Sequence, residues 1–244
     1  IETTYDSLGR IETIKYPDTT VIKYEYDTGG NLSKIKDSLT GTAYATYSGY
    51  NALGQYGVVS FANGVTTQYQ YYPLNNRLSS IKTTRQTTNF MDVVYEYDNA
   101  WNIKKITDYL DSTKTRSFKY DDLNRLIEAN SPSYGGNILY QYDKIGNMTY
   151  NCRYGSYYYD DPLHKHAVTR VVKNGTTIDT YIYDDNGNMT SGAGRTFTYD
   201  YDNRPTSITY GSTYAISVYD AGGNRVKKIT PNSTTTYIGQ LYEC

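Results

Sequence analysis

The side chains best suited to chemistry in this sequence lie around its only two histidines. His164 and His166 are two residues apart, so on a strand their imidazoles would share a face, and Asp160 and Asp161 precede them. Such a pair could ligate zinc. Beyond these two aspartates, no Cys, Asp or Glu at ligand spacing completes the set. The pattern therefore favours a solvated loop over a metal site.

The many aspartates could also bind calcium or act as paired carboxylates in hydrolysis. Nine of the 19, however, occupy one position of a recurring pattern, directly after a tyrosine, where a turn accounts for them. Motifs for a nucleophilic serine, a phosphate-binding loop or a zinc site are not found. The sequence therefore predicts no catalytic residue, no metal site and no cofactor, and an enzyme such as a glycosidase is the least favoured class.

The aspartates are positioned by a unit that recurs along most of the chain, which indicates a repeat architecture. Residues 24–32 show it fully: two rings two residues apart, then Asp, two variable residues, Gly-Asn and an apolar residue. Residues two apart share one face of a strand, and this alternation of rings with mostly polar residues is typical of β-structure. The ring pairs are Tyr24/Tyr26, Tyr69/Tyr71, Tyr95/Tyr97, Phe118/Tyr120, Tyr140/Tyr142, Tyr181/Tyr183 and Phe197/Tyr199.

The residues after each ring pair predict a turn. An Asp or Asn side chain accepts hydrogen bonds from nearby backbone amides, and a Gly or Asn three residues later supplies the positive φ that closes a type I turn. Each unit therefore predicts a β-hairpin with a four-residue turn. The predicted motif positions are Tyr5, Asp6, Gly9, Tyr26, Asp27, Gly30, Tyr50, Asn51, Gly54, Tyr97, Asp98, Tyr120, Asp121, Asn124, Tyr142, Asp143, Gly146, Tyr183, Asp184, Gly187, Tyr199, Asp200, Asn203, Tyr219, Asp220 and Gly223.

The strand that returns from each turn carries apolar residues three apart instead of two. Examples are Leu32/Ile35, Leu126/Ala129 and Val226/Ile229. No window sustains this spacing for the ten or more residues that a helix needs, so we expect a bulge at the start of the return strand.

The register of the units predicts how the chain is organised. The tyrosine that enters the turn recurs at residues 5, 26, 50, 72, 97, 120 and 142, and again at 183, 199 and 219. Between them, Tyr159-Asp160 starts a unit that no Gly-Asn finishes, and a strand 169–172, a turn at 174–175 and a strand 177–183 follow. We therefore expect regular repeats over 1–150, an irregular connection with a degenerate repeat over 151–176 and shorter repeats over 177–244, in one continuous array.

One unit departs from the pattern at a single residue. Trp101 stands where Gly belongs. Because a positive φ is costly for Trp, we expect either strain or a different turn at this position.

The composition excludes several classes of protein. A net charge of −1 and a pI near 6.2 give no electrostatic footprint for nucleic acid, and no apolar run approaches the roughly 20 residues of a membrane span. With 32 Tyr and 38% apolar residues, the chain suits thin sheets with large exposed faces. We expect the rings to form cross-strand ladders, with a sugar- or partner-binding surface as the alternative. Cys152 and Cys244 are too few for a disulfide framework, and free thiols are favoured.

These units resemble the YD-repeat, or Rhs (rearrangement hot spot), family, whose unit is Tyr-Asp, two variable residues, Gly, and Asn or Arg. The stretches 160–168 and 237–243 also resemble late repeats of its bacterial members. The resemblance implies an all-β fold in which consecutive antiparallel β-hairpins form a long, curved, spiralling sheet, part of a shell or fibre. In bacterial toxins of this family the shell encloses a C-terminal toxic domain, and in animal teneurins a similar shell belongs to a cell-adhesion receptor.

The resemblance also sets expectations for function. Family toxins place a self-cleaving core after the repeats, and we assign that activity to no residue here because the chain stops at Cys244, about where the core would begin. The chain starts inside a repeat, so we take it for a fragment that would form part of a shell wall. Its implied partners are neighbouring YD repeats of the parent or like chains and an enclosed toxin domain. The leading hypothesis is encapsulation by a secreted or surface bacterial toxin, and the alternative is an extracellular fibre, adhesion or scaffold protein without cargo.

Overall fold

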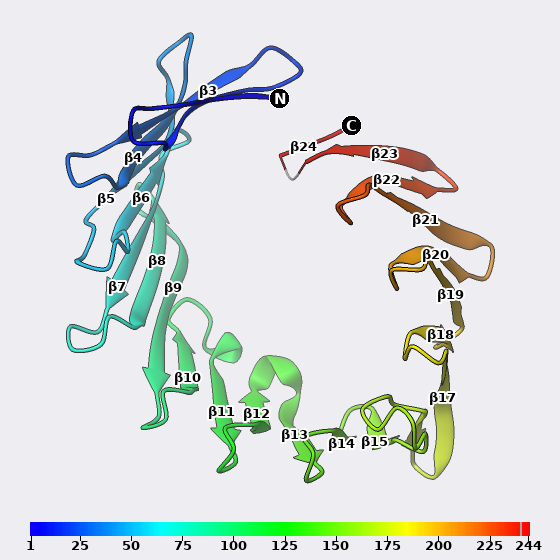
Figure 1. Cartoon of the computed structure of the whole chain (residues 1–244). Helices are drawn as coiled ribbons and strands as arrows, with labels where there is room; N and C mark the ends of the chain where they lie inside the picture. Colours follow the sequence, from blue (N-terminus) through cyan, green and yellow to red (C-terminus); the bar gives the residue numbers. More distant parts are fainter. Residues whose placement is uncertain (240) are drawn as a thin grey trace. The chain divides into compact units, whose positions relative to one another are not determined.

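The computed structural model describes residues 1–239 and 241–244 and consists almost entirely of β-strands, as predicted. Two single-turn 3-10 helices, η1 (Ser112–Lys114) and η2 (Pro132–Tyr134), are the exceptions among these residues. The chain divides into two compact units, unit 1 (Ile1–Asn137) and unit 2 (Ile138–Cys244) (Figure 1). No helix in the described part of the chain has the length and hydropathy needed to cross a membrane.

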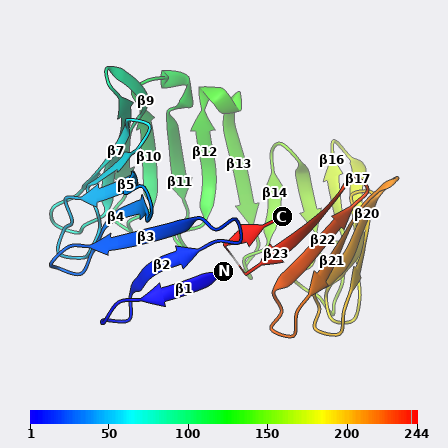
Figure 2. The ribbon, with the colours of Figure 1, turned by 90° about the horizontal axis from the view of Figure 1, so that it is seen from above.

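Unit 1 is built from twelve strands that follow one another along the chain. They are β1 (Glu2–Tyr5), β2 (Ile11–Lys15), β3 (Val21–Tyr26), β4 (Leu32–Asp37), β5 (Ala43–Ser48), β6 (Val58–Phe61), β7 (Val65–Tyr71), β8 (Leu78–Arg85), β9 (Thr88–Tyr97), β10 (Ile103–Asp108), β11 (Arg116–Tyr120) and β12 (Leu126–Ser131). Each strand pairs with the next in antiparallel fashion. The result is a single curved layer, in which β9 to β12 lie side by side (Figure 2).

Unit 2 repeats this plan with shorter strands. They are β13 (Gly136–Tyr142), which starts two residues before the unit, β14 (Met148–Asn151), β15 (Gly155–Tyr158), β16 (Arg170–Lys173), β17 (Thr176–Tyr183), β18 (Met189–Gly192), β19 (Arg195–Tyr199), β20 (Pro205–Tyr210), β21 (Thr213–Tyr219), β22 (Arg225–Thr230), β23 (Ser233–Ile238) and β24 (Tyr242–Glu243). Each again pairs antiparallel with its successor. Consecutive antiparallel hairpins are the predicted architecture, and it is confirmed.

The return strands carry the expected bulge, and it explains their three-residue spacing. Tyr26 pairs with Leu32 and Glu25 pairs with Lys34, so Ser33 is the extra residue on β4. As a result Ile35 faces Tyr24, and apolar residues three apart on the return strand match rings two apart on the first strand. The same shift occurs in five hairpins of unit 1 and four of unit 2. In the β21–β22 hairpin Val226 is the extra residue: Arg225 pairs with Tyr219 and Lys228 pairs with Ser217, while Ile229 pairs with Ile216.

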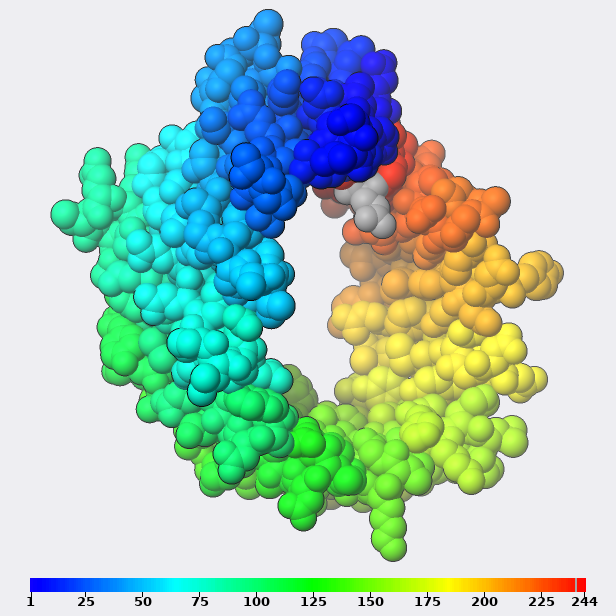
Figure 3. Space-filling view, turned by 60° about the vertical axis from the view of Figure 1, so that its left-hand side comes forward, coloured from blue at the N-terminus to red at the C-terminus, as the bar shows by residue number. Residues whose placement is uncertain are grey.

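The core lies on the face that carries the rings. The buried apolar residues are few and small for a chain of this size: Ile14, Ala45, Val59, Val93, Ala129, Ile138 and Val171. Each lies in the strand ladder on the same side as the paired rings, which are themselves half-buried. In unit 1 the opposite face carries cross-strand ion pairs such as Lys119 with Glu128, at 3.0 Å. Figure 3 shows groups of atoms that project outward from the strands of each unit.

The boundary between the two compact units lies between residues 137 and 138, whereas repeat regularity suggested boundaries after residues 150 and 176. Compactness and repeat regularity are different properties, so the division by repeat type stays a prediction. The strands expected at 169–172 and 177–183, with a turn at Asn174-Gly175, are present as β16 and β17.

Candidate functional site: the tyrosine-aspartate turn

The turn after β11 shows how the motif residues act together. Asp121 Oδ1 accepts hydrogen bonds from the backbone N–H groups of Leu123, at 3.0 Å, and Arg125, at 2.9 Å. Asn124 holds the positive φ of 60° that closes the turn. Chiefly because of the backbone N–H of Arg125, the pKa of the Asp121 carboxyl lies below its usual value. The aspartate is thus the centre of a hydrogen-bonded turn.

The same arrangement recurs at the other predicted motif positions. The side-chain oxygen of the Asp or Asn that follows the turn-entering tyrosine accepts a hydrogen bond from the backbone N–H four residues later. This holds at Asp6, Asp27, Asn51, Asp98, Asp121, Asp143, Asp184, Asp200 and Asp220. The positive φ is held by Gly9, Gly30, Gly54, Trp101, Asn124, Gly146, Gly187, Asn203 and Gly223. Trp101 therefore adopts the repeat's own turn, and the alternative of a different turn there was wrong.

The residue after the positive φ closes the turn from its side chain, a role that the sequence reading missed. Where it is arginine, its guanidinium pairs with the aspartate, as Arg204 Nε does with Asp200 Oδ2 at 2.7 Å. Where it is asparagine, its Nδ2 donates to the same oxygen, as Asn188 does to Asp184 at 2.9 Å. Both donors fit because the carboxylate oxygen needs one N–H and either side chain supplies it.

Neighbouring turns also touch along the edge of each sheet. Asn102 Nδ2 donates to Asn124 Oδ1 at 2.8 Å, and Asn188 Nδ2 donates to Asn203 Oδ1 at the same distance. In both pairs the asparagine that ends one turn reaches the residue of positive φ in the next. The structure thus brings together motif residues of successive repeats that lie 15 to 22 positions apart in sequence.

The turn-entering tyrosine joins each repeat to the one before it. Tyr26 Oη donates a hydrogen bond of 2.9 Å to the backbone carbonyl of Ile11, the first residue of the preceding return strand. The bulge interrupts the regular backbone ladder at that point, and the phenol supplies a donor beside it. The described bonds of this kind include those that join Tyr26 to Ile11, Tyr50 to Leu32, Tyr71 to Tyr56, Tyr97 to Leu78, Tyr120 to Ile103, Tyr159 to Met148, Tyr183 to Val168, Tyr199 to Met189 and Tyr219 to Pro205.

These bonds, here called the tyrosine ladder, correct two details of the predicted register. Tyr71, not Tyr72, takes the turn-entering position, and Tyr72 occupies the place of the aspartate in a turn one residue longer. Tyr159 donates to Met148 and Val168 accepts from Tyr183, so residues 159–168 form a repeat whose turn is enlarged. Pairing around the expected irregular connection is therefore continuous. The side chain of Tyr5, in the first hairpin, is exposed.

Comparison with known proteins also identifies the repeat. A family model described as RHS Repeat matches residues 5–42, which hold the first two tyrosine-aspartate turns. Residues 5–42 therefore match the Rhs repeat.

Several characterised proteins are similar in sequence to most of this chain. Toxin subunit YenC1 of Yersinia entomophaga is 25% identical over 262 residues, which cover 95% of this chain and 24% of that protein. The tRNA nuclease WapA of Bacillus subtilis strain 168 is 26% identical over 211 residues, covering 76% of this chain and 8% of WapA. Teneurin-4 of Mus musculus is 25% identical over 190 residues, which cover 74% of this chain and 6% of Teneurin-4. The chain thus spans about a quarter or less of the length of these relatives.

Solved structures share the fold. The Photorhabdus luminescens Tc holotoxin pore matches with a TM-score of 0.76 at 20% identity, over 96% of this chain and 14% of the matched chain. A TcdB2-TccC3 crystal structure matches with a TM-score of 0.77 at 19% identity, over 99% of this chain and 14% of the matched chain. At this identity the likeness establishes only that the chain shares its fold with the matched segments of these structures.

The two histidines lie in the enlarged turn of the repeat at 159–168, and each bonds a different neighbouring turn. His166 Nδ1 lies 2.7 Å from Asn147 Oδ1 in the turn before. His164 Nδ1 lies 2.8 Å from Asp161 Oδ2, and its Nε2 lies 3.3 Å from the carbonyl of Asp185 in the turn after. Over the described residues, His, Cys, Asp and Glu side chains form no group of three or more that could hold a metal ion. The geometry is that of a clamp between turns.

The His164 clamp predicts a pH dependence of stability. Both ring nitrogens face oxygen acceptors, and only the imidazolium can donate to both. The hydrogen bond to Asp161, followed by that to the Asp185 carbonyl, raises the pKa of His164 above its usual 6.5, and Asp184 and Asp185 add negative charge nearby. A raised folded-state pKa stabilises the fold fully below pH 6.5, and this contribution is lost as pH rises through the folded value.

We therefore expect the denaturant midpoint of unit 2 to decrease as the pH is raised from about 5 to about 8. In the His164→Gln variant this decrease should be absent. Hydrogen exchange of the amides in residues 159–189 locates the change. The matched control is His166→Gln, in the same turn but facing a single acceptor, which should keep the pH dependence. An unchanged pH profile in His164→Gln would contradict the clamp.

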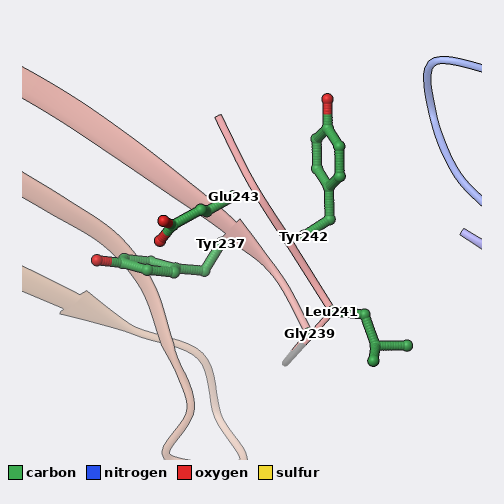
Figure 4. A pocket seen from close by; sticks show the side chains of 5 residues that line it. All are labelled: Tyr237, Gly239, Leu241, Tyr242 and Glu243. Carbon is green, nitrogen blue, oxygen red and sulfur yellow. The ribbon is translucent and has the colours of Figure 1, made fainter. Parts of the chain in front are cut away.

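The described cavities outside the turns are shallow. One of about 340 Å³ lies at the end of unit 2 and is lined by Tyr237, Gly239, Leu241, Tyr242 and Glu243 (Figure 4). The side chains of Tyr237 and Glu243 lie on one side of the strand, and those of Leu241 and Tyr242 point away (Figure 4). Cys152 is half-buried, and its Sγ accepts the backbone N–H of Leu139 at 3.3 Å, whereas Cys244 is exposed.

Proposed function

We propose that this chain is a section of the wall of an Rhs-repeat shell that encloses a C-terminal toxic domain of a secreted bacterial toxin. The observation that carries the proposal is the tyrosine ladder. Each repeat bonds the previous one through the same phenol and carbonyl, so the sheet can extend without any contact that closes it into a globular core. Such an array serves as a wall of adjustable length.

The regular bulges favour a closed shell over a flat ribbon. A bulge bends the strand that carries it and increases the local twist. In nine hairpins the extra residue lies at the same place on the return strand, so each bulge bends the sheet of its unit in the same sense. Repetition of one bend along a longer array leads to a curved enclosure.

In this proposal the motif residues, from Tyr5 to Gly223, have a structural role and take no part in catalysis. The partners are neighbouring Rhs repeats of the parent chain and the enclosed toxin domain, and the location is extracellular or at the cell surface. The division into regular repeats over 1–150, a connection over 151–176 and shorter repeats over 177–244 belongs to the same proposal. The name of the relative YenC1, a toxin subunit, supports this placement.

The second candidate is an extracellular fibre, adhesion or scaffold protein built from the same repeats without cargo. The match to Teneurin-4 favours it, because that relative is not named as a toxin. In this case the exposed strand edges would associate with further repeats.

Negative-stain electron microscopy of the intact parent polypeptide, purified under native conditions, separates the two. Encapsulation predicts closed hollow particles, and limited proteolysis of these should leave a protected fragment from a region C-terminal to this chain. The same digestion after denaturation is the control and should degrade that fragment. Filaments or open ribbons would overturn encapsulation in favour of the scaffold.

A further inference from the structure

Three hairpin tips of the chain carry an asparagine followed by glycine. The pairs are Asn63-Gly64 between β6 and β7, Asn174-Gly175 between β16 and β17, and Asn186-Gly187 between β17 and β18. In such a pair the backbone nitrogen of the glycine can attack the asparagine side chain, because glycine has no Cβ to shield its nitrogen. The attack requires a nitrogen without a hydrogen-bond partner and a side chain that is free to turn toward it. The three tips differ in both respects.

The tip at Asn63-Gly64 holds both reacting groups. The Gly64 N–H donates to the carbonyl of Phe61 at 3.0 Å. Asn63 Oδ1 accepts the backbone N–H of Val65 at 3.1 Å. Both hydrogen bonds must break before the nitrogen reaches the side-chain carbon, so the folded turn protects this pair.

The tip at Asn186-Gly187 is held in the same way, although by different partners. The Gly187 N–H donates to the carbonyl of Asp184 at 2.9 Å. Asn186 Nδ2 donates to Asn203 Oδ1 of the next turn at 3.1 Å. The space beside the glycine is also restricted, because a Cβ on Gly187 would lie 3.3 Å from Cδ2 of His164. The fold therefore protects this pair as well.

The tip at Asn174-Gly175 has none of these restraints. Its two residues form the whole turn, with φ values of 51° and 79°, and Lys173 pairs with Thr176 on either side of it. Over residues 1–239 and 241–244, neither the Asn174 side chain nor the Gly175 N–H has a hydrogen-bond partner. Both residues are exposed, and a Cβ on Gly175 would meet nothing within 4 Å. The two reacting groups are thus free to approach each other and open to water.

We propose that Asn174 is a modification site, at which the folded chain converts spontaneously to isoaspartate. The Gly175 nitrogen forms a bond to Cγ of Asn174, the bond from Cγ to Nδ2 breaks, and the proton of the attacking nitrogen leaves with the ammonia. Water then opens the resulting five-membered imide at either carbonyl, which gives aspartate or isoaspartate. In sum, one water is taken up and one ammonia is released, and no other reactant is needed.

Formation of isoaspartate opens the end of the β16–β17 hairpin. The isomer adds one carbon to the backbone between residues 174 and 175, whereas the left-handed two-residue turn matches the twist of its strands only at the normal length. The pairing of Lys173 with Thr176 is the first to be lost. The change stays local, because Val171, two residues further along β16, is buried and pairs with Asp179.

A comparison of the native chain with the denatured chain tests the site. Both are incubated at mildly alkaline pH, and peptide mass spectrometry follows the conversion of amide to carboxyl at each of the three pairs. A methyltransferase specific for isoaspartate is the probe that distinguishes isoaspartate from aspartate. In the native chain Asn174 should react at least about tenfold faster than Asn63 and Asn186, because no hydrogen bond must break first. In denaturant the three rates should become similar. Equal rates at the three pairs of the native chain, or no isoaspartate at Asn174, would overturn the proposal.

The matched control for the structural consequence is Asn174→Gly. Glycine accepts the positive φ of this position and has no side-chain amide, so the hairpin should form and the modification should be absent. Hydrogen exchange is measured before and after the incubation. The amides of residues 170–177 should exchange faster after incubation in the parent chain and at an unchanged rate in the variant. The same acceleration in both chains would show that isoaspartate does not open the hairpin.

Discussion

Of all Gly→Ala substitutions in this chain, Gly155→Ala should be the most destabilising, and it should act on unit 2. Gly155 begins β15 with a φ of 107°, and a Cβ there would lie 2.1 Å from the carbonyl oxygen and 2.9 Å from the carbonyl carbon of Val172. Both atoms are backbone of the paired strand β16, so no rotamer change can relieve the contact. The strands must separate, and the strain of the positive φ adds to this cost. We expect a loss of more than about 3 kcal/mol.

The control for the backbone strain is Gly136→Ala. Gly136 has nearly the same φ, 112°, but a Cβ there meets nothing within 4 Å. It therefore carries the conformational cost of about 1–3 kcal/mol without the collision. Denaturant midpoints of both variants, followed by circular dichroism, give the difference, and hydrogen exchange should place the loss of Gly155→Ala in β15 and β16. Equal effects of the two substitutions would mean that the strands do not approach as closely as the structure has them.

The local parts of this fold could be predicted from sequence because their causes are local. Asp121 and Asn124 lie three residues apart in the chain, and their roles in the turn follow from that spacing alone. The alternation of rings and polar residues likewise defined the strands, and three-residue apolar spacing indicated the bulge. What could not be predicted is which atoms meet between repeats. The bond from Tyr26 to Ile11 crosses 15 residues, and no spacing within one unit specifies it.

A signal for the ladder was nevertheless present in the ring pairs. Phenylalanine replaces tyrosine twice at the first ring, as Phe118 and Phe197, but never at the second. A ring that only packs can lose its hydroxyl, whereas one that donates a hydrogen bond cannot do so without leaving a carbonyl unpaired. The same ladder places Tyr159 and Val168 in register across an enlarged turn, which the missing Gly-Asn had concealed.

Removing three hydroxyls of the ladder should therefore cost stability out of proportion to the change in ring packing. In the triple variant of Tyr26, Tyr71 and Tyr120 to Phe, the carbonyls of Ile11, Tyr56 and Ile103 lose their side-chain donors. Each lost bond is worth about 1 kcal/mol, and the sites lie in separate hairpins, so their effects should add to about 3 kcal/mol. Denaturant unfolding of unit 1, followed through Trp101 fluorescence, measures the sum.

The matched control removes three hydroxyls from the first rings of the pairs, at Tyr24, Tyr69 and Tyr95. Among the described residues none of these phenols donates a hydrogen bond, although all three rings share the face and the half-burial of the ladder. The free energy of unfolding of this second triple variant should lie within about 0.5 kcal/mol of that of the parent. Phenylalanine already occupies two of the seven first-ring positions. If both triple variants lost the same stability, burial of the ring edge and not the bond to the carbonyl would join the repeats. A large loss confined to the second rings would mean that one phenol in each unit determines where the next hairpin pairs. A tyrosine is then needed once per repeat for as long as the sheet continues.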